Sequence, residues 1–379
     1  MTKATPESYL DVLDRICRDV IAAEAESVDR NGVFPSKSIA ALAEAGLLGA
    51  GSNPEVGGLG LSLRGGARVV ERIARECGST GMVTCMHFSG VAALEAFAPE
   101  GVRRAAASGE HLSTLAFSEA GSRSHFWAPV STAIRSGDDA VLLTAQKSWV
   151  TSATRAAAYV WSSLPLGGAE ASTLWLVPAD SKGLSVRGPF DGLGLRGNDS
   201  SPVDAENVHV PLSAMLGTDG GGFDAMLGIV LPMFNVCNAA VSVGLMQAAV
   251  ERTARHAVDA RYAHTGSSLA DFPTIRNYIA RMRVKADGAS ALLEDTLAAV
   301  EEGREEATLR VLECKAAAGE AATEVLDLAM RVSGGAAFRR EVGVERYFRD
   351  ARAAGVMGPT TDVLYDFIGK AVCGMELFA

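Results

Sequence analysis

The sequence of 379 residues contains no block rich in lysine and arginine, and its formal net charge is −10 with a pI near 5.2. Proteins that bind nucleic acids bring clustered basic side chains to the phosphates. The absence of such a cluster argues against a nucleic-acid-binding function. An anionic ligand would have to bind at a local basic site or at a helix N-terminus, against the overall charge.

Cysteine motifs are also missing. The chain has no Cys-x-x-Cys pair and no histidine at the spacing of a zinc site, and its six cysteines are Cys17, Cys77, Cys85, Cys237, Cys314 and Cys373. Isolated cysteines of this kind are usually small buried thiols in a reducing compartment. We therefore expect neither a metal site nor a disulfide framework.

Long hydrophobic runs and a targeting segment are absent as well. No window reaches the ~18 consecutive apolar residues of a membrane span, and the N-terminal segment MTKATPESYLDVLDRICRDV has early acidic residues and no apolar core of signal-peptide length. Hydrophobic residues make up 48% and charged residues 21%, as in ordinary globular proteins. The expectation is a cytoplasmic protein without a membrane span.

The N-terminal third has helical patterns. Thr5, Pro6 and Glu7 predict a helix start, with Thr5 as the N-cap and Pro6 in the first helical position. Residues 36–48 form a second amphipathic pattern that Gly46 closes, and a glycine-rich turn at 53–62 leads to further helices up to about residue 108. This part is predicted to be an α-helical domain over 1–111.

The pattern changes to short strands after residue 111. Runs rich in strand-forming residues are separated by Gly, Asp and Ser, which predicts an antiparallel, β-barrel-like domain over 112–217. The expected strands are Ser113–Phe117, Val130–Ile134, Ala140–Thr144, Ala158–Ser163, Thr173–Pro178 and Val203–Val210. Long Ala/Leu/Val-rich segments return at 223–262, 272–302, 305–333 and 360–376, which predict a four-helix bundle over 218–379. The fold class is α+β.

Four segments in this order match one known family. They are PEVGGLGLS at 54–62, LAFSEAGSRS at 115–124, KSWVTS at 147–152, and a C-terminal run in which Ser333-Gly334-Gly335 precedes ERYFRDAR at 345–352 and VMGPTTD at 356–362. Each segment alone is weak, because glycine pairs and buried tryptophans are common. Together, with the α–β–α order, they resemble the acyl-CoA dehydrogenase family over nearly the whole chain.

The resemblance implies FAD as cofactor and a flavin site made by two distant parts of the chain. The loop at 117–124 would offer backbone N–H groups and hydroxyls to the flavin, Trp149 an aromatic face, and Thr151 a hydrogen bond on the N5 side. The implied cofactor-binding residues are Phe117, Ser118, Ser124, Trp149, Thr151, Gly334, Gly335, Thr360 and Asp362. The same resemblance implies an acyl thioester as substrate, carried by coenzyme A or a carrier protein.

Three departures from the family concern its chemistry. Gly358 stands where many members have the glutamate that takes the α-proton of the thioester. Other members keep this base on the first bundle helix, but the corresponding stretch 231–236 has no carboxylate, and Asn235 stands where a substrate-side arginine is common. The family's RxQFG segment is represented by 264–270, so Arg261 or Arg276 would have to complete FAD binding.

Three functions remain open. The first is an FAD-dependent oxidoreductase that uses a non-standard base, with His87, Glu119, His125 and Asp362 as candidates, although each of them has an alternative structural role. The second is a flavin-dependent monooxygenase on the same scaffold, and the third is a non-catalytic flavin-fold subunit. The expected electron acceptor is a flavoprotein or oxygen. The apolar stretch Ala316–Met330 predicts a homo-oligomer, a dimer of dimers.

Overall fold

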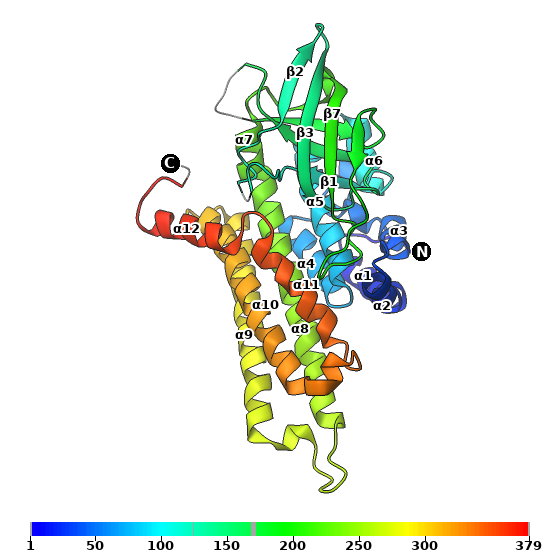
Figure 1. Ribbon diagram of the computed structural model, residues 1–379, viewed down its shortest axis with the longest axis vertical. Coiled ribbons are helices and arrows are strands. Elements are labelled where there is room, and N and C mark those ends of the chain that lie inside the picture. The colour runs from blue at the N-terminus through cyan, green and yellow to red at the C-terminus, as the bar shows by residue number, and fades with distance from the viewer. Residues whose placement is uncertain (1, 124, 168–171, 378–379) are drawn as a thin grey trace.

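The computed structural model describes residues 2–123, 125–167 and 172–377 of the chain. An N-terminal group of helices lies against a β unit and the upper part of a long helical bundle (Figure 1). The N-terminal helices are α1 Tyr9–Ile16, α2 Ala22–Asn31, α3 Ser36–Glu44, α4 Leu63–Ala74, α5 Gly78–Phe97 and α6 Glu100–Ser108, with a π-helical turn Cys17–Ile21 between α1 and α2.

The predicted start of the first helix is wrong by one turn. Helix α1 begins at Tyr9 with Ser8 as its N-cap residue. Thr5 and Ser8 instead close a separate turn, in which the Ser8 N–H donates to the Thr5 carbonyl and the Thr5 N–H donates to Ser8 Oγ. Hydroxyl groups compete in this way with helical hydrogen bonds. The predicted stop at Gly46 holds, because this residue has a φ of 78° after α3.

The middle of the chain forms two four-stranded sheets, in the orders β1-β4-β5-β8 and β2-β3-β7-β6. The strands are β1 Ser113–Ala116, β2 Thr132–Ser136, β3 Ala140–Val150, β4 Ala158–Ser163, β5 Thr173–Pro178, β6 Leu184–Val186, β7 Ser201–Pro211 and β8 Met215–Leu216. The pairings are antiparallel, as predicted, with one exception, since β1 pairs with β4 in parallel. The short strands β6 and β8 carry too little sequence pattern to have been predicted.

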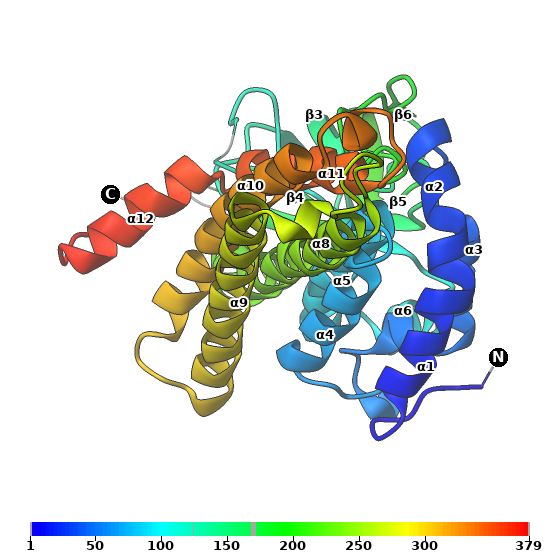
Figure 2. The same cartoon turned by 90° about the horizontal axis from the view of Figure 1, so that it is seen from below.

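The C-terminal region is helical, as predicted, but its fourth packed helix is a different one. The elements are α7 Gly222–Ala225, a π-helical turn Met226–Val230, α8 Leu231–Asp259, α9 Pro273–Glu302, α10 Ala307–Phe338, α11 Val344–Val356 and α12 Thr361–Val372. Helix α11 packs on α8 and α10 through buried Tyr347 and Ala351. Helix α12, predicted as the fourth bundle helix, projects sideways from α10 (Figures 1 and 2).

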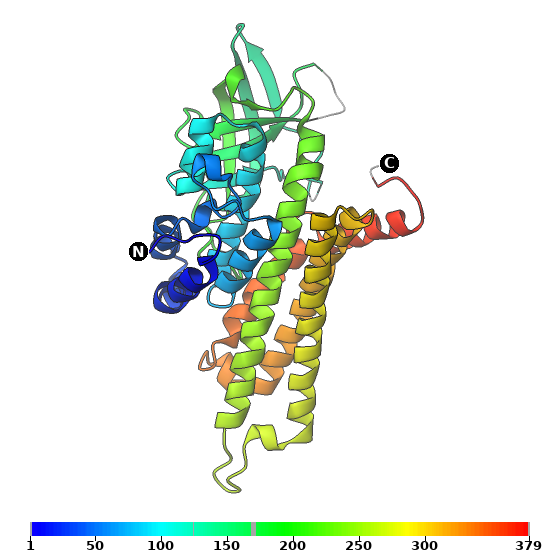
Figure 3. The same ribbon diagram turned by 180° about the vertical axis from the view of Figure 1, so that it is seen from behind.

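Helix α8 is the central element of the molecule. It contacts α4 and α5 on one side and α9, α10 and α11 on the other, and it runs behind the N-terminal helices in Figure 3. The helical run Gly222–Asp259 is long and apolar enough to span a membrane by length and composition, yet 72% of its most apolar window is buried inside the protein. Burial of this kind is typical of a core helix.

A buried carboxyl group joins α11 to the loop that precedes β7. Asp350 accepts a hydrogen bond of 2.6 Å from the Leu195 N–H, while the neighbouring Arg349 pairs with Asp29 of α2 at 2.6 Å. The backbones approach closely here, because a Cβ on Gly194 would lie 2.3 Å from the Arg349 carbonyl oxygen. The three regions of the chain are therefore held together at one point.

The buried carboxyl group of Asp350 should make the free energy of unfolding depend on pH. Burial raises its pKa to about 6 from an ordinary 3.8. The folded state then binds the proton more tightly than the unfolded state, so this contribution is complete below pH 3.8 and is lost as the pH rises through 6. The loss should reach about 3 kcal/mol, from a shift of about two pKa units. Asp350→Asn should abolish it, which urea unfolding of both proteins between pH 4 and 7 would measure. Parallel curves for the two proteins would contradict the assignment.

Candidate functional site

The loop after β1 is fixed to strand β3 by a buried ion pair. Glu119 and Lys147 are almost fully buried and contact each other directly. Lys147 Nζ also donates to the Ser162 carbonyl at 2.7 Å, and Glu119 accepts from Ser131 Oγ at 2.7 Å and from the Val130 N–H at 2.8 Å. Burial lowers the pKa of Lys147 to about 8, and Glu119 opposes this shift. Because its oxygens have these partners, Glu119 is a structural residue here rather than a free base.

Strand β3 has a bulge at the residues predicted to face the flavin. Lys147 pairs with Val203 and Val150 with Ser201, so two residues of β3 lie opposite one of β7. Trp149 in this bulge has a φ of 57° and is 70% exposed, whereas Thr151 just beyond it is buried. Bulges commonly re-aim a side chain beside a functional site. The arrangement presents the indole of Trp149 as an open aromatic surface.

The loop 117–123 lies beside this bulge. The Ser148 N–H donates to the Ser118 carbonyl at 2.9 Å, and Phe117 is buried against Phe126 with parallel rings 6.4 Å apart. Ser122 Oγ is buried and has no hydrogen-bond partner in the structure as described. Ser124, also predicted to bind the cofactor, lies outside the described residues.

The predicted contacts of the C-terminal part lie at two separate places, one near the end of α10 and the other at the start of α12 (Figure 1). Helix α10 is kinked at Gly334, which has φ 53° and ψ −134°. Open space surrounds the Cβ positions of Gly334 and Gly335, and the buried hydroxyl of Ser333 lacks a partner among the residues described. Thr360 caps α12 by accepting from the Val363 N–H. The orphaned hydroxyls at Ser122 and Ser333, the open glycines and the exposed indole fit a large polar and aromatic cofactor such as FAD.

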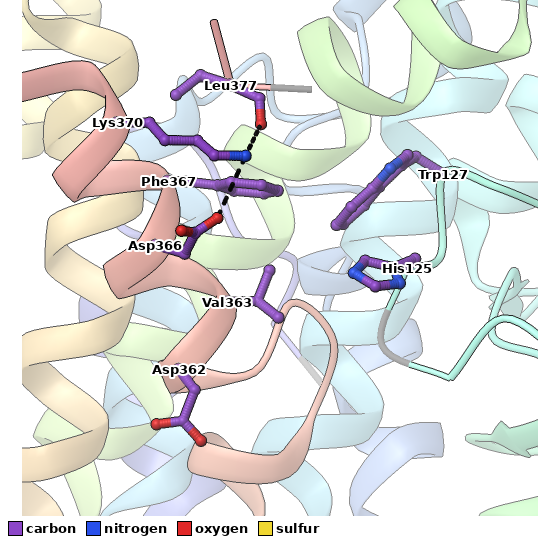
Figure 4. A pocket seen from close by; sticks show the side chains of 8 residues that line it. All are labelled: His125, Trp127, Asp362, Val363, Asp366, Phe367, Lys370 and Leu377. Carbon is purple, nitrogen blue, oxygen red and sulfur yellow. Dashed lines mark hydrogen bonds and ion pairs between the residues drawn. The ribbon is translucent and has the colours of Figure 1, made fainter. Parts of the chain in front are cut away.

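His125 and Asp362 line the same cavity, between the loop and α12 (Figure 4). The cavity has a volume of about 440 Å³ and includes an ion pair of 3.4 Å between Asp366 and Lys370. Its wall is formed by Trp127, whose ring lies 5.0 Å from the His125 ring and 5.3 Å from that of Phe367. The sequence motifs point to His125 and Asp362 but not to Trp127 and Phe367. No pattern in the sequence marks these two aromatics as neighbours.

His87 is not placed for proton transfer. It is fully buried on α5, where its Nδ1 accepts from the Ser113 N–H at 3.1 Å and its Nε2 lies 3.2 Å from the Leu48 carbonyl oxygen. A carbonyl can only accept, so the proton is on Nε2 and the ring is neutral. Burial lowers the pKa of His87 to about 4. Both ring nitrogens therefore serve backbone groups, which argues against a role as the base.

Lys315 holds the segment that contains Gly358. This buried side chain of α10 donates to the carbonyl oxygens of Ala354 at 3.2 Å, Met357 at 3.1 Å and Pro359 at 2.7 Å. Burial lowers the pKa of Lys315 to about 7, but three carbonyl acceptors match the three protons of an ammonium group. The sequence analysis missed this residue. The one sequence feature that could have indicated a buried lysine is its position among the small residues of 314–319.

We predict that Lys315→Met loosens residues 354–364. Loss of the ammonium leaves three carbonyls without their donor, and each unsatisfied buried group costs about 1–3 kcal/mol. Amide hydrogen exchange in this segment should become about tenfold faster or more. The matched control is Lys182→Met, because Lys182 is exposed in the loop before β6. Equal exchange in both variants would show that Lys315 does not order the segment.

The sequence matches three domain profiles in the order of the fold. The N-terminal domain of acyl-CoA dehydrogenase matches residues 4–107, the middle domain matches 114–208 and the C-terminal domain matches 220–373. The chain belongs to the acyl-CoA dehydrogenase family. The probable acyl-CoA dehydrogenase YngJ of Bacillus subtilis is 29% identical to it, over 90% of this chain and 91% of that protein. The human mitochondrial short-chain specific acyl-CoA dehydrogenase is also 29% identical, over 94% of this chain and 88% of that protein.

A solved member of this family has the same fold. Butyryl-CoA dehydrogenase from Megasphaera elsdenii superimposes with a TM-score of 0.91 at 20% identity, covering 97% of this chain and 98% of that chain. This acyl-CoA dehydrogenase homologue is accordingly an FAD-dependent oxidoreductase, as the resemblance of its motifs implied. The β3 bulge and the 117–123 loop would hold one part of FAD.

Proposed function

We propose that the protein oxidises an acyl thioester. The observation that carries the proposal is the family match, which spans residues 4–373. In agreement with it, strand β3 has the bulge that contains Trp149 and precedes Thr151, and Lys315 holds the segment 354–360 by hydrogen bonds. Bound FAD supplies the acceptor for the hydride that leaves the acyl chain. The protein must bind the thioester, exclude water and receive the α-proton.

We propose His125 as the residue that receives the α-proton. Of the four candidates, His87 and Glu119 have their polar atoms occupied, whereas His125 and Asp362 line one cavity. An imidazole is the side chain best suited to accept a proton near neutral pH. Trp149 would cover the flavin, Thr151 would bond its N5 side, and Ser118, Gly334, Gly335, Thr360 and Asp362 would complete the cofactor site.

Anaerobic mixing tests the reaction. A panel of acyl-CoA and acyl-pantetheine thioesters is added to the FAD-loaded protein, and the proposal expects the flavin absorbance to bleach with at least one of them. His125→Gln should slow bleaching about 10²-fold or more, since a placed base contributes that much, while Asp366→Asn serves as a control in the same cavity. Lack of bleaching with every thioester would overturn the proposal.

A monooxygenase is the second candidate. It is favoured by the lack of a carboxylate at 358 and along 231–236, because oxygenation needs no base for an α-proton. Mixing the chemically reduced protein with oxygen separates the two. A slow and spectrally distinct step before the flavin reoxidises supports the oxygenase, and no response to thioester or oxygen leaves a non-catalytic subunit.

We also propose a homo-oligomer, with a flavoprotein or oxygen as electron acceptor. The stretch Ala316–Met330, which motivated this prediction, is largely buried by the chain's own helices. Large apolar side chains are exposed elsewhere on the C-terminal region, including Phe338, Val356 and Val284. A partner subunit would remove such side chains from water. Light scattering should give a molar mass that is a multiple of 39.4 kDa, and we expect the mass of a tetramer. A stable monomer at micromolar concentration would refute the proposal.

A further inference from the structure

A second cavity of the molecule is lined mainly by arginines. It lies between α1 with its π-helical turn, α4 and α8, and has a volume of about 480 Å³. It shares no lining residue with the cavity of His125. Binding sites for small molecules usually measure about 300–1,000 Å³, so this cavity is large enough for a ligand. Its arginines are Arg18, Arg72, Arg75, Arg252 and Arg255.

The close packing of α4 on α8 brings four of these arginines together. A Cβ on Gly244 of α8 would lie 2.4 Å from the Glu71 carbonyl oxygen of α4, so the two backbones nearly touch. Like charges three residues apart on a helix repel each other. The four arginines form two such pairs, Arg72 with Arg75 at the end of α4 and Arg252 with Arg255 on α8. The cavity therefore concentrates positive charge in a chain whose net charge is −10.

The acidic side chains of the cavity neutralise only part of this charge. Arg72 pairs with Asp14 and Glu76, and Arg75 pairs with Glu251. Within residues 2–123, 125–167 and 172–377, no ion pair is formed by the other three, Arg18, Arg252 and Arg255. Guanidinium groups without a counter-charge attract anions.

Arg252 is held in place by an aromatic ring. It is half-buried, and its guanidinium group lies 5.4 Å from the centroid of the Tyr347 ring. The Tyr347 hydroxyl donates to the Arg75 carbonyl at 2.8 Å, which fixes the ring. A side chain that is ordered before a ligand arrives loses less entropy on binding. Arg18 lies on the π-helical turn Cys17–Ile21, and such turns are frequent at functional sites.

We propose that this cavity binds a small molecule that carries a phosphate group. A guanidinium group offers two parallel N–H donors that match the oxygens of a phosphate. A phosphate dianion also balances the excess of five arginines over three carboxylates in the lining. A carboxylate ligand carries one charge only, and an uncharged ligand would leave the whole excess in place. This ligand is separate from the thioester, so the inference does not depend on the reaction proposed above.

Isothermal titration calorimetry tests the proposal with inorganic phosphate, pyrophosphate and AMP as probes. The protein is loaded with FAD, so that its flavin site is occupied, and is titrated at about 0.15 M salt, where distant charges are screened. At least one probe should bind once per chain with a dissociation constant of about 1 mM or lower. Tighter binding of AMP than of the inorganic anions would support a phosphate ester as the ligand, and tighter binding of phosphate or pyrophosphate would support a free anion.

Substitutions assign the binding to the cavity. Arg252→Gln and Arg255→Gln should each weaken it about tenfold or more, because a hydrogen bond to a charged group contributes roughly that factor. Arg255 is exposed and forms no ion pair in the part of the chain that the structure describes, so its loss should leave the fold and the FAD content unchanged. The matched control is Arg15→Gln, which removes the same charge from the last turn of α1 but does not line the cavity.

Three results would overturn the proposal. The first is that none of the three probes binds. The second is an equal loss of binding in the Arg15 and Arg255 variants, because binding would then follow the general charge of the surface rather than the cavity. The third is binding of polyglutamate that depends on the same arginines while no phosphate compound binds, which would assign the cavity to an acidic protein partner.

Discussion

In the His125→Gln variant, replacing Gly358 by glutamate is expected to increase the exchange of the substrate's α-proton by about 10²–10⁴-fold, the usual contribution of a placed base. The backbone at this position is already held, because Lys315 bonds the carbonyls of Met357 and Pro359. A carboxylate introduced between them gains a nearby ammonium group, which favours its ionised form. Deuterium uptake at the α-carbon of butyryl-CoA, followed by mass spectrometry, measures the effect without requiring hydride transfer.

The control for this substitution is Gly358→Gln, which adds the same volume without a base. Only the glutamate should accelerate exchange. If glutamate and glutamine at 358 both leave exchange at the rate of the His125→Gln protein, the α-carbon does not lie beside residue 358. That result would separate this chain from the family's substrate geometry, although the fold and the flavin site would be unaffected.

Lys147→Met is expected to destabilise the protein by about 3–5 kcal/mol, because it leaves the Glu119 carboxylate buried without its cation. The pair lies inside the β unit, and Trp161 is 5.2 Å from the ammonium group. Glu119 also binds the N–H groups of Val130 and Ser131, so the loss should spread to the flavin loop. Urea unfolding of the FAD-loaded protein would show the change.

Two further variants make this measurement specific. Lys285→Met removes one member of an exposed pair with Glu324 and should change stability by at most about 1 kcal/mol. Adding Glu119→Gln to Lys147→Met should restore part of the loss, because the uncompensated charge disappears. A double variant as unstable as the single one would show that packing, rather than the buried charge, causes the effect.

The residues that the sequence predicts to bind the flavin come in short local segments. Trp149 and Thr151 are two residues apart, and Phe117 and Ser118 follow a strand that the sequence shows clearly. Their grouping required only the assignment of strands and the resemblance to a family. The exposed position of Trp149 also depends on the bulge of β3, which no local pattern announces.

The surroundings of Lys315 and His87 could not be predicted, because they are made by residues distant in sequence. The sequence analysis makes no prediction for Lys315, which is buried against three carbonyls only by the packing of α10 on the 354–359 segment. His87 read as a candidate base until the folded chain placed its nitrogens against Leu48 and Ser113. The chemistry of such side chains depends on neighbours that are far from them in the sequence and are brought close only by folding.

The family, the order of the helical and β regions, and the glycine at position 358 are apparent from the sequence alone, since local composition and short motifs encode them. The tertiary structure decided which helix completes the bundle. Helix α11 packs on α8 and α10 because Tyr347 and Ala351 are buried there, whereas α12 projects. It also decided that His125 shares a cavity with Asp362. Partners, burial and distance between remote residues exist only after the chain has packed.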